Sequence, residues 1–524
     1  MQDGDPLSPS FGCFHYAYWR DKTSEFPDAR FQEAGATLGM LASGKFDSLA
    51  ASESLPDRER LYGGFSAGLE QLRRQQYKEG CFDEWYKGER GFAVTEFTAI
   101  AYGLAARLLD EQIERADRDV LEHVLRASGT WLAARRDKVK ANHQAAAAAA
   151  LALIWKVTGD DIYRDAAKDA LQDTLARQTD EGWFPEIGGM DLGYCSVLLD
   201  YCMLFNAVTG DDECLSPMRR LTAFMLPHIH PDTTISPESG LCLNPYVSRI
   251  GFALLAEHDE TAASLVNLLK EFSPAEKALS AIVGDDLRFC RWSHLPLVAL
   301  DIVEHAPERA APRFAESYPE GWTLRQNSLV AAYHRDNLHV FVSAAGGGTV
   351  RAYRDQVCLF EDHGLALEQD VTTWVNNGYD TSRSMTLEEN ELRLEAPLRP
   401  ATFFFPGFLS RLVLRVGCTF AWSATMLRAM IDWVRIRSGT AINQSAAPMA
   451  KGRAQFRWSR AIAITETEVA ITDAVEAQTN ARISSPPRLF WNGLVNPKAT
   501  QEDPDSFPVS TFRTVKRFGH RLES

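Results

Sequence analysis

The chain has 524 residues, of which 45% are hydrophobic and 24% charged, values that are ordinary for a globular protein and exclude a disordered one. This length exceeds the size at which one hydrophobic core stops growing, so we expect two domains. The net charge of −15 argues against nonspecific binding to nucleic acid, which needs a positive field, but it leaves room for a small basic pocket that binds an acidic ligand.

The amino-terminal stretch and the cysteines bear on the compartment. MQDGDPLSPS has neither a basic region nor an apolar core, so the chain as given carries no recognisable signal peptide. No uninterrupted apolar stretch approaches the roughly 20 residues that span a bilayer, and we expect no membrane insertion. Nine cysteines without CxxC spacing indicate reduced thiols, and no residue cluster has metal-ligand spacing. We therefore expect a cytoplasmic protein without metal or cofactor, or a periplasmic or secreted one if a leader was removed.

An aromatic and basic arm precedes the first helix. The segment FHYAYWRDKTSEFPDARFQEAG contains Tyr16, Tyr18, Trp19, Arg20 and Lys22. Aromatic faces stack on sugar rings and cations attract carboxylates, so the arm is a candidate wall of a glycan cleft. Packing in a hydrophobic core explains the same residues equally well.

Helical periodicity dominates from about Phe31 to about His305. Segments such as FTAIAYGLAARLLDEQI and CSVLLDYCMLFNAV carry apolar residues at helical spacing, separated by Gly, Pro and Asp. After APERAAPRF the pattern changes to alternating strands, with SLVAAYHRDNLHVFVS and AIAITETEVAITDAVEA as examples. The glycines of AAGGGTVRAY lie between two such runs and indicate a hairpin turn rather than a phosphate loop. We expect a helical domain over 1–310, arm included, and an antiparallel β-sandwich over 311–524.

An internal repeat of about fifty residues lies in the helical part. KVTGDDIYRDA at Lys156 recurs as AVTGDDECLSP at Ala207, an offset of 51 positions, and EIGGMDLGY at Glu186 has a weaker echo at Glu238. Stacked helical hairpins produce repeats of this length. We expect the hairpins to close into an α/α toroid, an inner ring of helices inside an outer ring, because the loops carry large aromatics suited to a sugar-binding funnel.

The repeat places polar residues at equivalent positions. It aligns His143 with Tyr194 and Tyr194 with Tyr246, and Asn142 stands beside His143. Equivalent positions in a closed ring face the same end of one axis, so these side chains should converge on one cavity. The six alanines after Gln144 allow close helix packing behind them. A helix cap for Asn142 and core packing for His143 are the structural alternatives.

The stretches KANHQAA and DEGWFPEIGGMDLGY resemble the heparinase II/III-like and toroidal alginate lyases, polysaccharide lyases that combine an α/α toroid with a β-sandwich. The resemblance implies that Asn142 neutralises a uronate carboxylate and that Tyr194 acts as acid or base, assisted by His143. It implies cleavage of an acidic polysaccharide by β-elimination, in a setting such as exopolysaccharide turnover. These lyases usually bring another His from a GHxHxD-like stretch of the β domain, which this chain lacks; His334 is a weak substitute.

β-Elimination requires that negative charge on the intermediate be dispersed, and a phenol needs a cation nearby to act as a base at neutral pH. Besides His143, the candidate cations are Arg249, Arg291 and His294, and spacing does not select among them.

Two alternatives share the fold. A toroidal glycoside hydrolase would use paired carboxylates, with Glu84, Glu186 and Asp191 as candidates in loops that contain Trp85 and Trp183. Helix-start acids that complement the macrodipole explain the same residues. The second alternative is a non-catalytic glycan-binding protein that has kept the fold.

Overall fold

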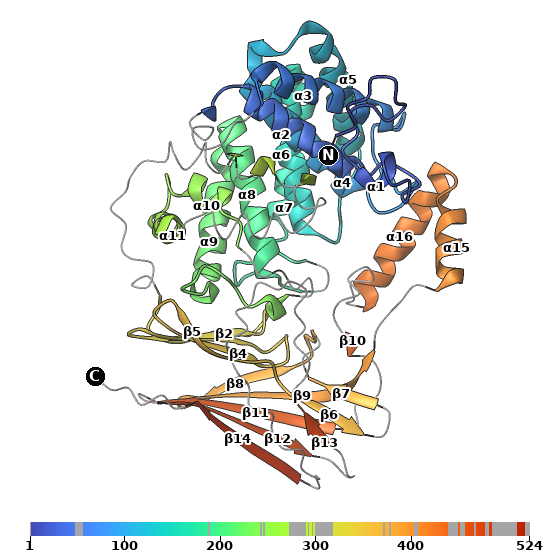
Figure 1. Cartoon of the computed structure of the whole chain (residues 1–524). Coiled ribbons are helices and arrows are strands. Elements are labelled where there is room, and N and C mark those ends of the chain that lie inside the picture. The colour runs from blue at the N-terminus through green and yellow to red at the C-terminus, as the bar shows by residue number, and fades with distance from the viewer. Residues whose placement is uncertain are drawn as a thin grey trace.

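The computed structural model describes residues 2–47, 56–186, 189–240, 244, 247–271, 290–291, 293–295, 297–298, 318–369, 372–376, 379–402, 407–438, 449–450, 456–465, 468–476, 482–484 and 511–518 (Figure 1). Helices fill the amino-terminal part and two antiparallel sheets the carboxy-terminal part, as the sequence predicts. The boundary predicted at residue 310 lies outside the described residues.

The helical domain consists of two layers of alternating helices. The inner helices pack on one another in chain order, and each is followed by an antiparallel outer helix. The inner layer is α2 (Glu33–Ala42), α4 (Phe92–Leu109), α6 (Ala141–Thr158), α8 (Leu192–Thr209) and α10 (Ile250–Leu255). The outer layer is α3 (Arg58–Gln75), α5 (Arg115–Ala133), α7 (Asp161–Leu175), α9 (Leu215–Met225) and α11 (Glu260–Glu271). A short helix, α1 (Tyr16–Trp19), lies in the amino-terminal arm.

The repeated Thr-Gly-Asp triplets are the corners of two hairpins. Gly159 and Gly210 end α6 and α8 in the left-handed conformation, with φ of 68° and 73°, which glycine adopts without steric cost. The aspartate that follows each glycine accepts a hydrogen bond from a backbone N–H of the next helix. The predicted hairpin repeat is therefore confirmed, and local capping explains its sequence signature.

Helix α6 lies in the middle of the layer and is buried on nearly every side. It packs against α4, α7 and α8, and the alanines of 145–150 are at most 1% exposed. Side chains of one carbon let three helices approach together at native packing density. The alanine run is thus a packing requirement of the crowded inner layer.

Two helices are long and apolar enough to cross a membrane by length and composition. They are Phe92–Gln112 and Leu192–Thr209, and 78% and 67% of their apolar windows are buried within the protein. An acid interrupts each of them, Glu96 in the first and Asp200 in the second, and inner-layer helices that others enclose are apolar on most sides.

The two ends of the helical layer meet, as a toroid requires. Ser293 Oγ lies 2.8 Å from Thr37 Oγ1 of α2, and Arg291 forms a 2.7 Å ion pair with Asp28. Cys290 joins Phe14 and Phe31 in a small apolar cluster. Part of the arm therefore packs in the core where the ring closes.

The β domain is a sandwich of two sheets. The five-stranded sheet has the order β1-β2-β3-β4-β5, and the second has the path β13-β6-β7-β9-β11-β12-β14, with β8 and β10 also paired to β9. One apolar core contains residues of both sheets. The first sheet comprises β1 (Gly321–Arg325), β2 (Val330–Arg335), β3 (Leu338–Ser343), β4 (Thr349–Arg354) and β5 (Val357–Asp362). The second comprises β6 (Ala366–Gln369), β7 (Thr372–Val375), β8 (Ser384–Glu388), β9 (Glu391–Thr402), β10 (Met449–Ala450), β11 (Phe456–Ile464), β12 (Val469–Glu476), β13 (Arg482–Ser484) and β14 (Thr511–Phe518).

The β domain also contains a glycine-rich turn and a helical hairpin. The glycines after β3 form the predicted hairpin turn, since Ser343 pairs with Thr349 across antiparallel β3 and β4. Two helices, α15 (Phe408–Gly417) and α16 (Ala421–Ser438), leave the second sheet between β9 and β10 and extend toward the helical domain (Figure 1).

The five-stranded sheet lies against the helical domain. Arg351 of β4 makes two 2.8 Å hydrogen bonds to the carboxylate of Glu238, which belongs to a short helical turn after α9. Tyr379 Oη donates to the carbonyl of Met190, just before α8, over 3.4 Å. The sheet therefore covers the end of the toroid at which α8 begins.

Candidate active site

The inner helices α4, α6 and α8 begin at the same end of the toroid, because one antiparallel outer helix separates each from the next. A helix start presents free N–H groups and the positive end of the macrodipole, so this end favours negative charge. His143 is the third residue of α6 and Tyr194 the third of α8, which confirms the predicted register. Tyr246 lies outside the described residues.

His143 is held by an acid that the sequence analysis did not identify. Its Nδ1 lies 2.6 Å from Oε1 of Glu96 on α4, and both side chains are buried. Burial raises the pKa of Glu96 well above its usual value, and the nearby Asp137 raises it further. Glu96 is the one acid in the apolar helix α4, and that was the available signal. The contact fixes the orientation of the imidazole ring.

Lys140 lies on the other side of the imidazole. Its Nζ is 3.5 Å from His143 Nε2, and its side chain is partly exposed. An ammonium carries donors only, so Nε2 faces a cation and not an acid. The cation beside His143 is thus Lys140, whereas the sequence predicted Arg249, Arg291 or His294.

Asn142 adds an amide beside His143. Its backbone N–H donates to Glu186 Oε1 over 3.0 Å, while its side-chain Oδ1 is buried without a hydrogen-bond partner in the described structure. An unpaired buried polar atom costs about 1–3 kcal/mol, and because an amide oxygen only accepts hydrogen bonds, the partner that would satisfy it is a donor. Asn142 is 2% exposed and His143 7%, so a bound group would reach them only by displacing a cover.

The acids of the loop before α8 have structural partners. Glu186 accepts the N–H of Asn142 at the start of α6, and burial raises its pKa to about 8, against the opposing effect of Lys140. Asp191 accepts the backbone N–H of Tyr194 over 3.0 Å and caps α8. Trp183 is buried, and its Nε1 donates to Glu181. Each helix start is therefore completed by an acid of this loop.

A buried ionic network lies beside the His143–Glu96 pair. Arg30 pairs with Glu33, and Arg291 pairs with Glu84 at 3.0 Å. Phe97 connects the two regions: its ring centroid lies 4.2 Å from the Arg30 guanidinium and 5.5 Å from the centroid of His143. The interior of the toroid thus carries charged groups of both signs.

Besides Arg291 and Glu84, two further predicted residues belong to this network. His294 Nδ1 lies 3.9 Å from Glu33 Oε2, and both atoms are buried without hydrogen-bond partners among the described residues. Burial raises the pKa of Glu33 to about 8 even though Arg30 opposes the shift. Trp85 is 63% exposed, and the Arg291 guanidinium lies 5.3 Å from its ring centroid, so this aromatic face is accessible from solvent.

The other predicted residues lie elsewhere. Arg249 precedes α10 and is partly buried, which lowers its pKa. His334 is buried against the helical domain, where its Nε2 lies 2.9 Å from the carbonyl of Pro227 and its ring stacks on Tyr318 at 4.1 Å. His334 therefore packs at the domain junction, and its partners are different from those of His143.

A different histidine of the β domain joins the ionic groups at the junction. His363 Nδ1 lies 3.5 Å from Glu238 and its Nε2 3.4 Å from Glu361, which also pairs with Arg351. Burial lowers the pKa of His363, but the hydrogen bonds to the two carboxylates outweigh it and raise the pKa above its usual value. Asp191 packs against Gly240, two residues after Glu238, so this cluster is near the start of α8.

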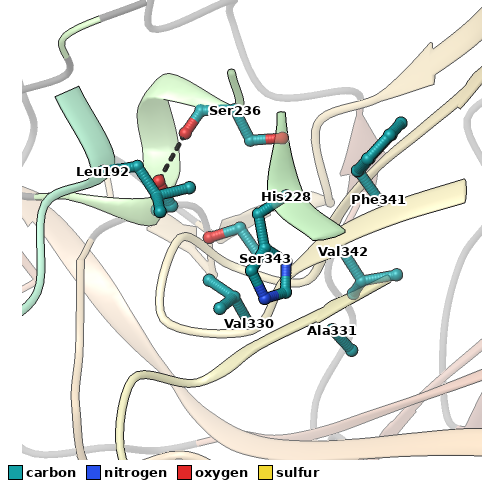
Figure 2. Close-up of a pocket in the computed structure, with 9 residues that line it drawn as sticks. Leu192, His228, Ser236, Val330, Ala331, Phe341, Val342 and Ser343 are labelled. Carbon is teal, nitrogen blue, oxygen red and sulfur yellow. Dashed lines mark hydrogen bonds between the residues drawn. The ribbon is translucent and has the colours of Figure 1, made fainter. Parts of the chain in front are cut away.

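The junction also contains a small cavity (Figure 2). Leu192, His228, Ser236, Phe341 and Ser343 are among the residues that line its volume of about 10 Å³, which is the space of about one water molecule. Small-molecule sites usually measure about 300–1,000 Å³, so this cavity does not hold a sugar unit. No group of three or more His, Cys, Asp or Glu side chains that could hold a metal ion occurs among the described residues.

No protein-family model matches the sequence, and no curated protein matches it. Solved structures with a similar fold include a mutant chondroitin AC lyase from Streptomyces coelicolor A3, with a TM-score of 0.49 and 9% identity over 92% of this chain and 68% of that one. Heparinase III has a TM-score of 0.48 and 8% identity, over 85% of this chain and 62% of its own. A third polysaccharide lyase has a TM-score of 0.33 and 10% identity, over 56% of this chain and 97% of its own.

Proposed function

We propose that the protein is a polysaccharide lyase that cleaves a uronate-containing glycan by β-elimination. The observation that carries the proposal is the arrangement at the start of α6: an imidazole fixed by Glu96, with the ammonium of Lys140 on one side and the Asn142 amide next to it in the chain. These are the groups that abstraction of a proton next to a carboxylate requires.

Lys140 and Asn142 would bind the carboxylate of the uronate. The ammonium supplies a positive charge, and the amide supplies a donor at the positive end of α6. Together they would disperse the charge that develops when the proton on C5 is removed. The ammonium of the partly exposed Lys140 lies against Nε2 and must move before Nε2 can reach the substrate. The carboxylate of the uronate attracts this ammonium and so draws it away from Nε2.

His143 and Tyr194 would transfer the protons. An imidazole has an unperturbed pKa near 6.5 and a phenol near 10, so at neutral pH the imidazole suits the base and the phenol the acid. His143 Nε2 takes the proton from C5, the electron pair forms the C4=C5 double bond, and the C4–O bond breaks. Tyr194 gives its proton to the leaving oxygen, which departs as a hydroxyl group.

One observation favours glycoside hydrolysis as a second candidate. Burial raises the pKa of Glu186 to about 8, so this acid is protonated at neutral pH and suits a general acid. Its bond to the Asn142 N–H makes it a helix cap as well, which is why we place elimination first.

The experiment is to incubate the protein with a panel of uronate-containing glycans and to measure ultraviolet absorbance and reducing ends together. Elimination forms a conjugated unsaturated uronate, so absorbance and reducing ends rise in parallel. Reducing ends without absorbance would favour hydrolysis. If neither absorbance nor reducing ends increase, both the lyase and the hydrolase proposals are contradicted.

Tyr194→Phe removes one oxygen and should abolish most turnover by elimination. Tyr163→Phe is the matched control, because Tyr163 lies on the outer helix α7 and its Oη donates to the carbonyl of Arg126. Equal activity of the two variants would exclude Tyr194 as the acid.

A further inference from the structure

The hairpin formed by α15 and α16, residues 408–438, exposes an unusual amount of apolar surface. Among the described residues, fifteen large hydrophobic side chains are exposed, and ten of these lie in the hairpin. Their exposed fractions range from 44% to 81%. They are Phe408, Leu409, Leu412, Val413, Val416, Phe420, Trp422, Met426, Met430 and Trp433. Contiguous apolar surface of this kind usually marks an interaction site.

The exposed residues of α16 form one stripe. Trp422, Met426, Met430 and Trp433 follow one another at intervals of four, four and three residues, which confines them to an arc of about 80° at 100° per residue. Ala424 and Leu427 are buried or half-buried, and they lie on the other side of the helix. Helix α16 thus packs with one face and presents a second apolar face to solvent.

Helix α15 is amphipathic in the same way, and none of its side chains is buried. Leu409, Val413 and Val416 are exposed on one side, while Arg411 and Arg415 lie toward the opposite side at 100° per residue. Arg415 lies 3.3 Å from Glu25, and Gly88 packs against Cys418 at the turn between the helices. Contacts with the helical domain therefore involve the end of α15 and the turn that follows it, and the apolar side of α15 remains exposed.

The charge of the hairpin is opposite to that of the protein. Residues 408–438 contain five arginines and one aspartate, a net charge of +4, so the rest of the chain carries −19 to give the total of −15. Two hairpins packed on each other would bring +4 against +4, which opposes a symmetric dimer through the hairpin. An anionic surface is the complementary partner.

The apolar side chains select among anionic partners. An acidic glycan offers hydroxyl and carboxylate groups, which do not replace the water around Leu409, Val413, Met426 and Met430. Acyl chains at a bilayer surface are apolar and do replace that water. Helices with tryptophan, phenylalanine and leucine on one face and arginines on the other lie in the plane of the bilayer interface.

We propose that this hairpin holds the protein on the surface of an anionic lipid bilayer, with the apolar side of α15 and α16 in the interface. No segment crosses the bilayer in this arrangement, so it differs from the insertion considered in the sequence analysis. The proposal stands on the hairpin alone and does not depend on the glycan chemistry.

The test is co-sedimentation of the full chain with vesicles of phosphatidylcholine containing phosphatidylglycerol, and with vesicles of phosphatidylcholine alone. We expect binding to the anionic vesicles that weakens as salt is added. Val413→Ser with Met426→Ser should reduce the partition coefficient about tenfold, as two lost apolar contacts imply. Arg411→Glu with Arg415→Glu should reduce it at least tenfold, because each arginine near an anionic surface contributes about 1 kcal/mol.

The matched controls change the same residue types elsewhere on the surface. Ile162→Ser with Val357→Ser removes exposed apolar side chains, and Arg393→Glu with Arg457→Glu reverses exposed charges on strands of the second sheet. Both should bind like the wild type, and circular dichroism should show all variants folded. Equal binding to both kinds of vesicle, or binding that survives the hairpin variants, would overturn the proposal. Dimerisation or capture of soluble acidic glycan that the hairpin variants abolish, without vesicle binding, would identify another occupant and equally overturn it.

Discussion

The imidazole of His143 is fixed by the carboxylate of Glu96, which lies on the preceding inner helix with its Oε1 2.6 Å from Nδ1. This contact directs Nε2 toward Lys140. Under the proposed mechanism Glu96 is a positioning residue, since it acts on substrate only through His143.

Glu96→Gln should lower kcat about 10- to 100-fold, the range found when a group that orients a histidine is changed. The amide keeps a polar partner for Nδ1 but cannot carry the negative charge that stabilises an imidazolium, so the imidazole should bind its proton less tightly and the neutral base should persist to lower pH. The measured direction is therefore a shift of the acidic limb of the pH–rate profile toward lower pH in Glu96→Gln. Glu70→Gln on an outer helix is the control, and a fall in stability without a change in the profile would indicate a purely structural Glu96.

Lys140→Gln should raise KM for a uronate glycan about tenfold, the loss expected for one charge-assisted contact of about 1.4 kcal/mol. The fold should not change, because Lys140 is partly exposed. Steady-state kinetics with Lys138→Gln as the exposed neighbouring control separates this effect from the loss of net charge. An unchanged KM would exclude Lys140 from carboxylate binding.

Local signals predicted the hairpins well, and contacts between distant residues were out of reach. The Thr-Gly-Asp corners are recognisable because the capping glycine and aspartate are adjacent in sequence. The pair His143–Glu96 joins residues 47 positions apart, and Arg291 reaches Asp28 across 263 positions. No spacing rule links such residues before the ring closes. Lys140 is only three positions from His143, but the sequence does not show that its side chain turns toward Nε2.

Ala148→Leu should destabilise the protein by about 1–3 kcal/mol, the cost of adding methylenes to a filled core. Ala148 is fully buried in α6 between three helices, so no space receives the larger side chain. Ala116→Leu, on the exposed side of α5, should change stability by less than about 0.5 kcal/mol. Urea unfolding followed by circular dichroism measures both, and equal stability of the two variants would contradict dense packing around α6.

Asp473→Ala should destabilise the β domain by about 3–5 kcal/mol, because it leaves a buried cation with fewer partners. Both carboxylate oxygens lie 2.7 Å from nitrogens of the fully buried Arg460, and one also accepts from Trp458 Nε1. Glu320→Ala removes an exposed acid just before β1, at a residue without a positive φ, and should be neutral within error. Thermal unfolding of the two variants compares them, and a similar Tm would show that Asp362 alone satisfies Arg460.

The His363 cluster should make the domain junction weaker as the pH rises. The pKa of His363 is raised in the folded protein, so its contribution to stability is complete below the unfolded value of 6.5 and is lost as the pH rises through the folded value. The pKa of Glu238 is held far below its usual range: burial raises it, but Arg351 and His363 outweigh that effect. Its contribution is present above the unfolded value of 4.5 and is lost only at very low pH.

Between about pH 6 and pH 9, the range in which histidines titrate, the wild type should therefore lose more stability than His363→Gln, whose side chain carries no charge at any pH. Urea unfolding at each pH gives the two slopes, and His123→Gln, an exposed histidine of α5, should retain the wild-type slope. Parallel curves for the wild type and His363→Gln would mean that His363 does not hold a proton at the junction, and the bonds of Arg351 to Glu238 would then account for the contact between the domains.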